Sequence, residues 1–195
     1  IYTRTEAKLF LSQFLFSEGR RDSALRYLNE LRREYPENTL FMVLYAAWQH
    51  RLHNIEGAMA AARAAFDLNN RKKIRYGEEL VYSTLGSIHF TLNDFANART
   101  YYLLYMQRTR NNERTPNQTN LRAGLACEIL GDRATALEFY RRMREPDSQN
   151  SFWDQNNYRR GQELLHHPLT DAQVLIVMGG NESSQKNHAR AIELF

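Results

Sequence analysis

The stretch Asn93-Asp94-Phe95-Ala96-Asn97-Ala98 places a short polar turn before an alanine that opens a segment with helical spacing. The same arrangement occurs at Glu18-Gly19-Arg20-Arg21-Asp22-Ser23-Ala24 and again at Gly131-Asp132-Arg133-Ala134-Thr135-Ala136. A block that recurs near the ~34-residue period of a helix-turn-helix unit cannot bury its own apolar face and must stack on its neighbours. We therefore predict an all-α fold, a right-handed α-α solenoid of helix-turn-helix repeats.

Alignment on the turn and its alanine gives five units, which begin near Thr5, Thr39, Glu79, Asn117 and Ala172. The third unit has a bulky residue early in its first helix, a Leu-Gly pair in the middle, and then an alanine and an aromatic residue in its second helix. These residues are Tyr82, Leu85-Gly86, Ala98 and Tyr102. The pattern resembles the tetratricopeptide repeat family. Because the glycine and the alanines stand where two helix backbones cross, we expect that no larger side chain fits there.

The resemblance and the spacing together predict a single repeat domain over residues 1–195. Its expected parts are repeats near 5–38, 39–70, 79–112 and 117–150, an extra helix at 151–167, and a truncated repeat at 172–195. The extra helix is expected because residues 151–167 carry Phe152, Trp153 and Tyr158 and form too long a stretch for a loop. The fifth repeat stops before its second helix is complete.

Composition excludes several classes of protein. With 43% hydrophobic and 25% charged residues, the chain lies in the globular range, and its formal charge of +4 permits an acidic partner without requiring one. The single cysteine, Cys127, excludes an internal disulfide framework. No apolar run approaches the ~18 residues of a membrane span. We expect a soluble protein of unknown compartment, cytoplasmic or periplasmic if it is bacterial.

Catalytic and metal-binding patterns are missing from the sequence. His50 and His53 lie three residues apart on one predicted helix, but no glutamate completes a metalloprotease pattern and no third ligand lies nearby. There is also no phosphate-binding loop, nucleophile elbow or dinucleotide fingerprint. We therefore expect neither an enzyme nor a cofactor.

The family resemblance implies that the first helix of each repeat lines a concave groove. An apolar strip of this kind suits a peptide or an amphipathic helix, so we expect a noncatalytic protein-interaction scaffold with a protein partner. The expected groove residues are Leu9, Gln13, Phe16, Leu40, Val43, Ala47, His50, Leu80, Ser83, Ser87, Phe90, Leu121, Leu125 and Glu128. An alternative is that the extra helix around Trp153, or further repeats, covers part of this strip. The clamp with which chaperone-binding members hold a C-terminal carboxylate is not matched here.

Basic residues recur near the ends of the second helices. They are Arg71, Lys72, Lys73, Arg75, Arg108, Arg110, Arg141, Arg142 and Arg144. Cations there offset the partial negative charge of a helix C-terminus, which explains the recurrence without a ligand. Stacked repeats could instead align them into one basic edge that binds RNA or another polyanion. A third possibility, suggested by the truncated last repeat, is that the chain is a docking segment of a longer multidomain protein.

Overall fold

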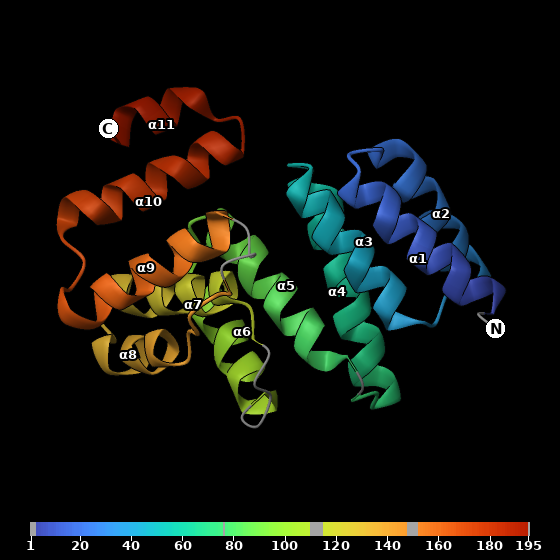
Figure 1. Cartoon of the computed structure of the whole chain (residues 1–195), viewed down its shortest axis with the longest axis horizontal. Coiled ribbons are helices and arrows are strands. Elements are labelled where there is room, and N and C mark those ends of the chain that lie inside the picture. Colours follow the sequence, from blue (N-terminus) through green and yellow to red (C-terminus); the bar gives the residue numbers. More distant parts are fainter. Residues whose placement is uncertain (1–2, 76, 110–114, 148–151, 195) are drawn as a thin grey trace. The chain divides into compact units, whose positions relative to one another are not determined.

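A computed structural model describes residues 3–75, 77–109, 115–147 and 152–194, and these residues form α-helices joined by short turns (Figure 1). The helices are α1 (Arg4–Ser17), α2 (Arg21–Glu34), α3 (Thr39–Arg51), α4 (Ile55–Lys72), α5 (Glu78–Thr91), α6 (Phe95–Arg108), α7 (Asn117–Ile129), α8 (Arg133–Arg141), α9 (Phe152–His166), α10 (Asp171–Ser184) and α11 (His188–Leu194). No strand occurs in these four ranges. The predicted all-α fold class is confirmed.

The chain divides into two compact units, and the boundary falls inside α5. The first unit comprises residues 1–84 and contains α1 to α4 with the start of α5, while the second comprises residues 85–195. The core of the first unit includes Leu28, Leu31 and Trp48. The core of the second unit is built around Tyr102 and Tyr140. The single repeat domain expected over residues 1–195 stays a prediction.

Five helix pairs share one turn geometry. The residue before each second helix's N-cap has a positive φ; these residues are Gly19 (75°), His53 (60°), Asn93 (57°), Gly131 (80°) and Lys186 (63°). The following residue donates its backbone N–H to the carbonyl five residues earlier, at 2.9–3.0 Å in each case. This left-handed turn satisfies a carbonyl at the end of the first helix and reverses the chain at once. The same reversal in every pair makes the helices of a repeat antiparallel neighbours.

One second helix, α2, lacks the side-chain N-cap that α4, α6 and α8 have. Asn54, Asp94 and Asp132 each accept a hydrogen bond from a first-turn backbone N–H, at 3.1, 3.3 and 3.2 Å. At the equivalent place before α2 stands Arg20, which makes no side-chain cap hydrogen bond. Since an N-cap of this kind contributes ~1 kcal/mol, α2 lacks a stabilising group that α4, α6 and α8 possess.

The helices of a pair cross on small residues. Ala24, Ala58, Ala98 and Ala136 are all 0% exposed. On the facing first helices, a Cβ built on Gly86 would lie 2.8 Å from the Tyr102 ring, and one built on Gly124 would lie 2.2 Å from the Tyr140 ring. The small side chains therefore leave the space that the buried tyrosines fill.

The helix α9 packs on both α7 and α8 in the second unit (Figure 1). Arg133 joins them, because its guanidinium donates to the carbonyl oxygen of Leu164 and to Oε1 of Glu128, both at 2.6 Å. The Glu128 carboxylate also accepts from the Tyr140 hydroxyl at 2.8 Å and from the backbone N–H of Leu169 at 3.0 Å. One buried carboxylate thus fixes the end of α9 and the start of the segment that follows it.

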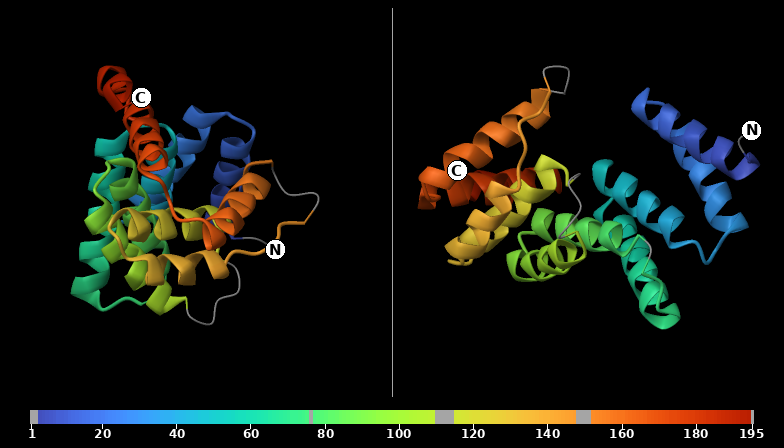
Figure 2. Two further views of the ribbon diagram at one scale, coloured as in Figure 1. Left: turned by 90° about the vertical axis from the view of Figure 1, so that its left-hand side faces the viewer. Right: turned by 60° about the horizontal axis from the view of Figure 1, so that its bottom comes forward.

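The helices α10 and α11 lie side by side (Figure 2), and α10 also contacts the α5–α6 turn. The Asn181 amide donates to the carbonyl of Phe90 at 2.7 Å and to Oδ1 of Asn93 at 2.8 Å. The Gln185 amide donates to the carbonyl of Thr91 at 2.7 Å. These bonds hold α10 against the C-terminal end of α5, where the Phe90 carbonyl also accepts from the backbone N–H of Asn93 at 3.0 Å.

Overpacking at a helix crossing tests the repeat register. Ala98→Leu or Ala136→Leu should lower the free energy of unfolding by about 1–3 kcal/mol, because a fully buried crossing has no room for the larger side chain. Urea unfolding measures the change, and Ala96→Leu on an exposed position of α6 is the matched control. Equal stability of the Ala98 and Ala96 variants would show that the register is wrong.

The Gly124 position tests the same packing from the facing helix. Gly124→Ala should destabilise the protein by about 1–3 kcal/mol, since the added Cβ would meet the buried Tyr140 ring. Gly180→Ala in α10 is the control, because nothing lies within 4 Å of its Cβ. That control should gain about 0.5–1 kcal/mol from helix propensity. Thermal unfolding distinguishes the expected loss of stability in Gly124→Ala from the expected gain in Gly180→Ala. A gain of stability in both variants would contradict the packing.

The contact between Arg133 and Glu128 tests how α9 is held. Arg133→Met should lower the free energy of unfolding by about 2–4 kcal/mol, because it leaves a buried carboxylate without its cation. Hydrogen exchange should accelerate in α9 first. Arg160→Met removes an exposed pair with Glu163 and should cost less than about 0.5 kcal/mol. If both variants left exchange in α9 unchanged, Arg133 would not be what holds this helix.

Candidate functional site

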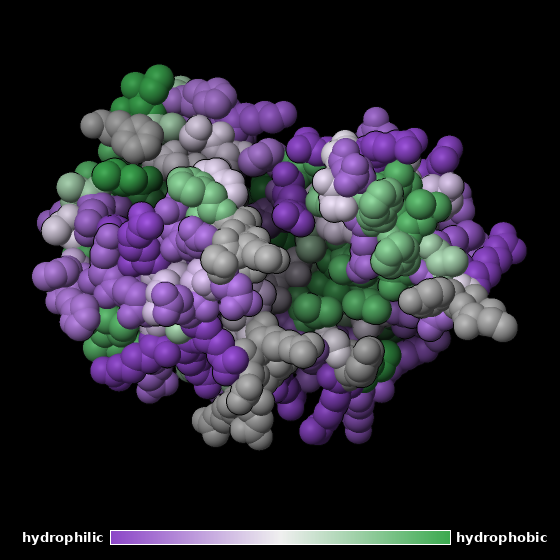
Figure 3. Space-filling model, in the orientation of Figure 1, coloured by the Kyte–Doolittle hydropathy of each residue, from purple (hydrophilic) through white to green (hydrophobic). Residues whose placement is uncertain are grey.

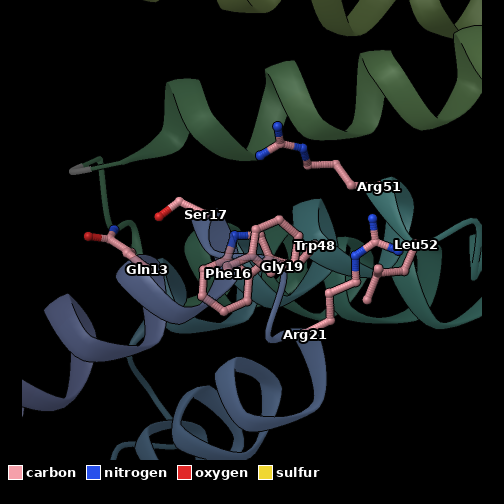
Figure 4. A pocket seen from close by; sticks show the side chains of 8 residues that line it. All are labelled: Gln13, Phe16, Ser17, Gly19, Arg21, Trp48, Arg51 and Leu52. Atoms are coloured by element: carbon pink, nitrogen blue, oxygen red, sulfur yellow. The ribbon is translucent and has the colours of Figure 1, made fainter.

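A pocket with a volume of about 600 Å³ opens at the C-terminal ends of α1 and α3, within the first unit. Its lining comes from α1, the α1–α2 turn, the first residue of α2, and the end of α3. The lining residues are Gln13, Phe16, Ser17, Gly19, Arg21, Trp48, Arg51 and Leu52. We call this the α1–α3 pocket. Figure 4 shows the Phe16 and Trp48 rings overlapping at its centre, with the two arginines on one side and Gln13 and Ser17 on the other.

Two aromatic rings form the floor of the α1–α3 pocket. The Phe16 and Trp48 ring centroids are 4.5 Å apart, and the ring planes differ by 15°, which is a stacked arrangement. Trp48 is only 6% exposed, whereas Phe16 is half-buried, so the stack is anchored in the core and reaches the surface through Phe16. A rigid, partly exposed ring is a good contact surface because it loses little entropy on binding.

The rim of the pocket is positively charged. The Arg51 guanidinium lies 5.5 Å from the centroid of the Phe16 ring, and Arg21 is exposed on the α2 side. Within the described ranges, neither arginine is paired with a carboxylate. Arg21 also stands in the first turn of α2, where the helix dipole disfavours a cation. Its position is therefore not explained by the stability of its own helix.

The expected groove residues of the first unit are distributed over several environments. Gln13 and Phe16 line the α1–α3 pocket, while Leu9 packs against the core. Ala47, His50 and Ser83 are half-buried, Leu80 is 40% exposed, and Leu40 lines a separate pocket with Tyr35 and Ile74. Val43 is 2% exposed and belongs to the buried core. Of this set, the structure brings Gln13 and Phe16 together at one opening.

The expected groove residues of the second unit are mostly buried. Phe90 is 4% exposed, and Leu121 and Leu125 are both 8% exposed. Ser87 hydrogen-bonds the Tyr102 hydroxyl at 3.1 Å, and Glu128 binds Arg133, Tyr140 and the backbone of Leu169. The alternative that the extra helix covers part of the strip describes what is seen here, since α9 packs on α7. These side chains have little surface left for a partner.

Six of the eight pocket residues were missing from the set expected from the family's groove positions, among them Arg21, Trp48 and Arg51. A signal for positive charge near the pocket was present, because Arg20 stands at the place where the third and fourth repeats have Asp94 and Asp132. Trp48 carried no such signal, since a tryptophan in an apolar helix is equally expected in the core. The aromatic stack depends on how α1 and α3 pack, and that contact is not visible in the pattern of one repeat.

The basic residues lie at the C-terminal ends of the second helices, as expected. Arg71 and Lys72 are in the last turn of α4, with Lys73 as its C-cap and Arg75 just beyond; Arg108 ends α6, Arg141 ends α8, and Arg142 is its C-cap, followed by Arg144. Lys72 pairs with Glu37. The α4 group belongs to the first unit and the others to the second, while Arg110 lies outside the described residues. A continuous basic edge stays a prediction.

Acid–base and metal chemistry have few candidates here. Burial raises the pKa of the Cys127 thiol to about 12, so this core cysteine is neutral near pH 7. Burial, and then the hydrogen bond to Glu128, also raise the pKa of the Tyr140 hydroxyl. Across the described ranges, no three His, Cys, Asp or Glu side chains group as metal ligands would. None of the helices described has the length and apolar character needed to cross a bilayer.

Comparison with known proteins agrees with the repeat architecture. Residues 81–112 match the profile of the tetratricopeptide repeat family, a segment that holds most of α5 and all of α6. The crystal structure of MamA protein has a similar fold, with a TM-score of 0.54 and 14% sequence identity over 98% of this chain and 87% of that chain. No curated protein matches the chain in sequence.

The fold is thus of the helical-repeat class, in which each helix pair packs on the next. Residues 81–112 match the tetratricopeptide repeat family, and the other helix pairs described have the same turn, so the helix pairs are tetratricopeptide-like repeats. Such repeats generally act as noncatalytic interaction modules. The resemblance found in the sequence is confirmed.

Proposed function

We propose that this protein is a noncatalytic scaffold that binds a peptide or a short helix of a protein partner on the α1–α3 face of its first unit. The observation that supports this choice is the α1–α3 pocket, where a half-buried Phe16 stacks on Trp48 beside two arginines without carboxylate partners in the described ranges. Partly exposed aromatic and arginine side chains are the types most often found at the centre of protein interfaces.

The two units differ in how much of the first-helix face is open. In the second unit, α9 packs on α7, and the apolar residues Leu121 and Leu125 are buried. In the first unit, the ends of α1 and α3 border a pocket, and Figure 3 shows hydrophobic surface gathered over these two helices. Phe10 and Phe14 of α1 are 69% and 52% exposed. The first unit therefore offers the better docking surface.

Binding of RNA or another polyanion along a basic edge is a weaker candidate. The basic residues stand in the last turns of α4, α6 and α8 or just beyond them, where they stabilise helix ends without any ligand. The two candidates also respond differently to salt. Contacts with phosphates weaken steeply as salt rises, whereas binding that depends on an apolar pocket changes little.

A peptide-display selection on the immobilised full chain tests the proposal. Selected peptides should bind in solution and lose about tenfold or more in affinity with Gln13→Trp, because the exposed Gln13 lines the pocket and the larger ring would fill it. Arg63→Trp, on an exposed position of α4, is the matched control and should leave affinity unchanged. Calorimetry at about 50 mM and about 500 mM NaCl measures both.

Two results would contradict this proposal. One is a set of selected peptides that bind equally well to the Gln13 and Arg63 variants, which would place the binding surface elsewhere. The other is the absence of any selected peptide together with binding of a single-stranded oligonucleotide only at low salt. That second result would move the function to the basic residues.

A further inference from the structure

We infer that the α1–α3 pocket selects an extended peptide segment in which an acidic residue stands two positions from an apolar one. This inference rests on the proposed function and adds the chemistry of the ligand. It follows from three features of the pocket: the chemical types of its lining, the geometry of its floor and rim, and an exception among the five repeat turns.

The lining determines the sign of the charge that fits. Among its eight residues are two arginines and no aspartate or glutamate. Asp22 of α2 lines a different pocket, with Arg26 and Arg33, and forms no ion pair with Arg21 in the described ranges. An apolar ligand alone would leave both guanidinium groups without a carboxylate partner. A carboxylate would instead accept the paired N–H groups of a guanidinium in a bidentate geometry.

The floor and rim set the spacing of the two ligand groups. The Phe16–Trp48 stack offers a flat apolar surface, and the Arg51 guanidinium lies 5.5 Å from the Phe16 centroid. Successive side chains of an extended peptide point to opposite sides, so side chains that share a side are two residues and about 6.6–6.8 Å apart. Because this spacing is close to the separation of Arg51 from the Phe16 ring, an apolar side chain on the ring brings an Asp or Glu two residues away within reach of Arg51.

The turn before α2 differs from the other turns because it carries positive charge, which suits an acidic ligand. Asn54, Asp94 and Asp132 cap α4, α6 and α8, but Arg20 takes the equivalent place and caps nothing. Arg20 and Arg21 thus put two cations at a helix N-terminus, where they are electrostatically unfavourable. Sequences break a local rule of this kind mostly at functional sites. A need for positive charge beside the α1–α3 pocket accounts for the departure.

The experiment compares acidic peptides with their amide counterparts on the full chain. Peptides from the display selection should be enriched in Asp or Glu two residues from an aromatic or aliphatic residue, and changing that acid to its amide should weaken binding about tenfold. Arg51→Gln should weaken the acidic peptide similarly and leave the amide peptide unchanged. Arg51→Glu should shift a repeated selection towards Lys or Arg at the same peptide position.

Arg20→Asp gives a variant whose folding is not in question. An aspartate there supplies the N-cap that α2 lacks, so the melting temperature should stay the same or rise. Affinity for the acidic peptide should nevertheless fall several-fold, because the pocket loses a nearby cation and gains an anion. A binding loss in a variant of undiminished stability cannot come from unfolding.

The outcomes separate this inference from the function on which it rests. Peptides that require the pocket but bind as well in amide form, or bind Arg51→Gln and Arg20→Asp normally, would overturn the acidic preference and leave the scaffold function standing. If Gln13→Trp left peptide affinity unchanged, both the acidic preference and the proposed scaffold function of this pocket would be overturned. Tighter binding of a single-stranded oligonucleotide than of any acidic peptide, lost in Arg51→Gln, would overturn the inference in favour of a phosphate ligand.

Discussion

The hydrogen bond from the N-cap of each second helix to the carbonyl five residues earlier is the interaction on which the rest of this structure depends. It is made in all five turns described, at 2.9–3.0 Å, and it requires a left-handed residue just before the cap. Glycine meets that requirement without strain, whereas His53, Asn93 and Lys186 adopt the same conformation at some energetic cost. Once the chain reverses there, the two helices must cross closely, and only alanine or glycine fits at the crossing.

This dependence explains why the fold could be predicted from sequence. The turn residues and the alanine that follows are local, and they recur, so they are visible in a single chain without any knowledge of its tertiary contacts. Gly86, Ala98 and Tyr102 identified the third repeat, and that is the segment that matches the tetratricopeptide repeat profile. The residues that the turn and the helix crossing physically require are therefore the same residues that reveal the repeat in the sequence.

The candidate site could be predicted only in part, because it depends on contacts between repeats. Gln13 and Phe16 were identified from their helix positions, but the Trp48 ring beneath Phe16 was not. Glu128 occupies a position that faces the groove in the family, yet here its carboxylate already binds Arg133, the Tyr140 hydroxyl and a backbone N–H. The periodic pattern gives the face on which a side chain lies. It does not give what packs on that face, such as α9.

The packing of α9 on α7 also limits the size of the ligand that the proposed scaffold can bind. With that face of the second unit covered by the chain itself, the open part is bordered by two first helices, α1 and α3. A width of ~8–10 Å, the usual distance between the axes of packed helices, spans only about two to three residues of extended chain. A footprint this short favours weak, rapidly exchanging contacts, which become durable when several copies of the motif or of the scaffold act together. The proposed scaffold would then bind a short motif, and the number of motif copies bound at once would set the lifetime of the complex.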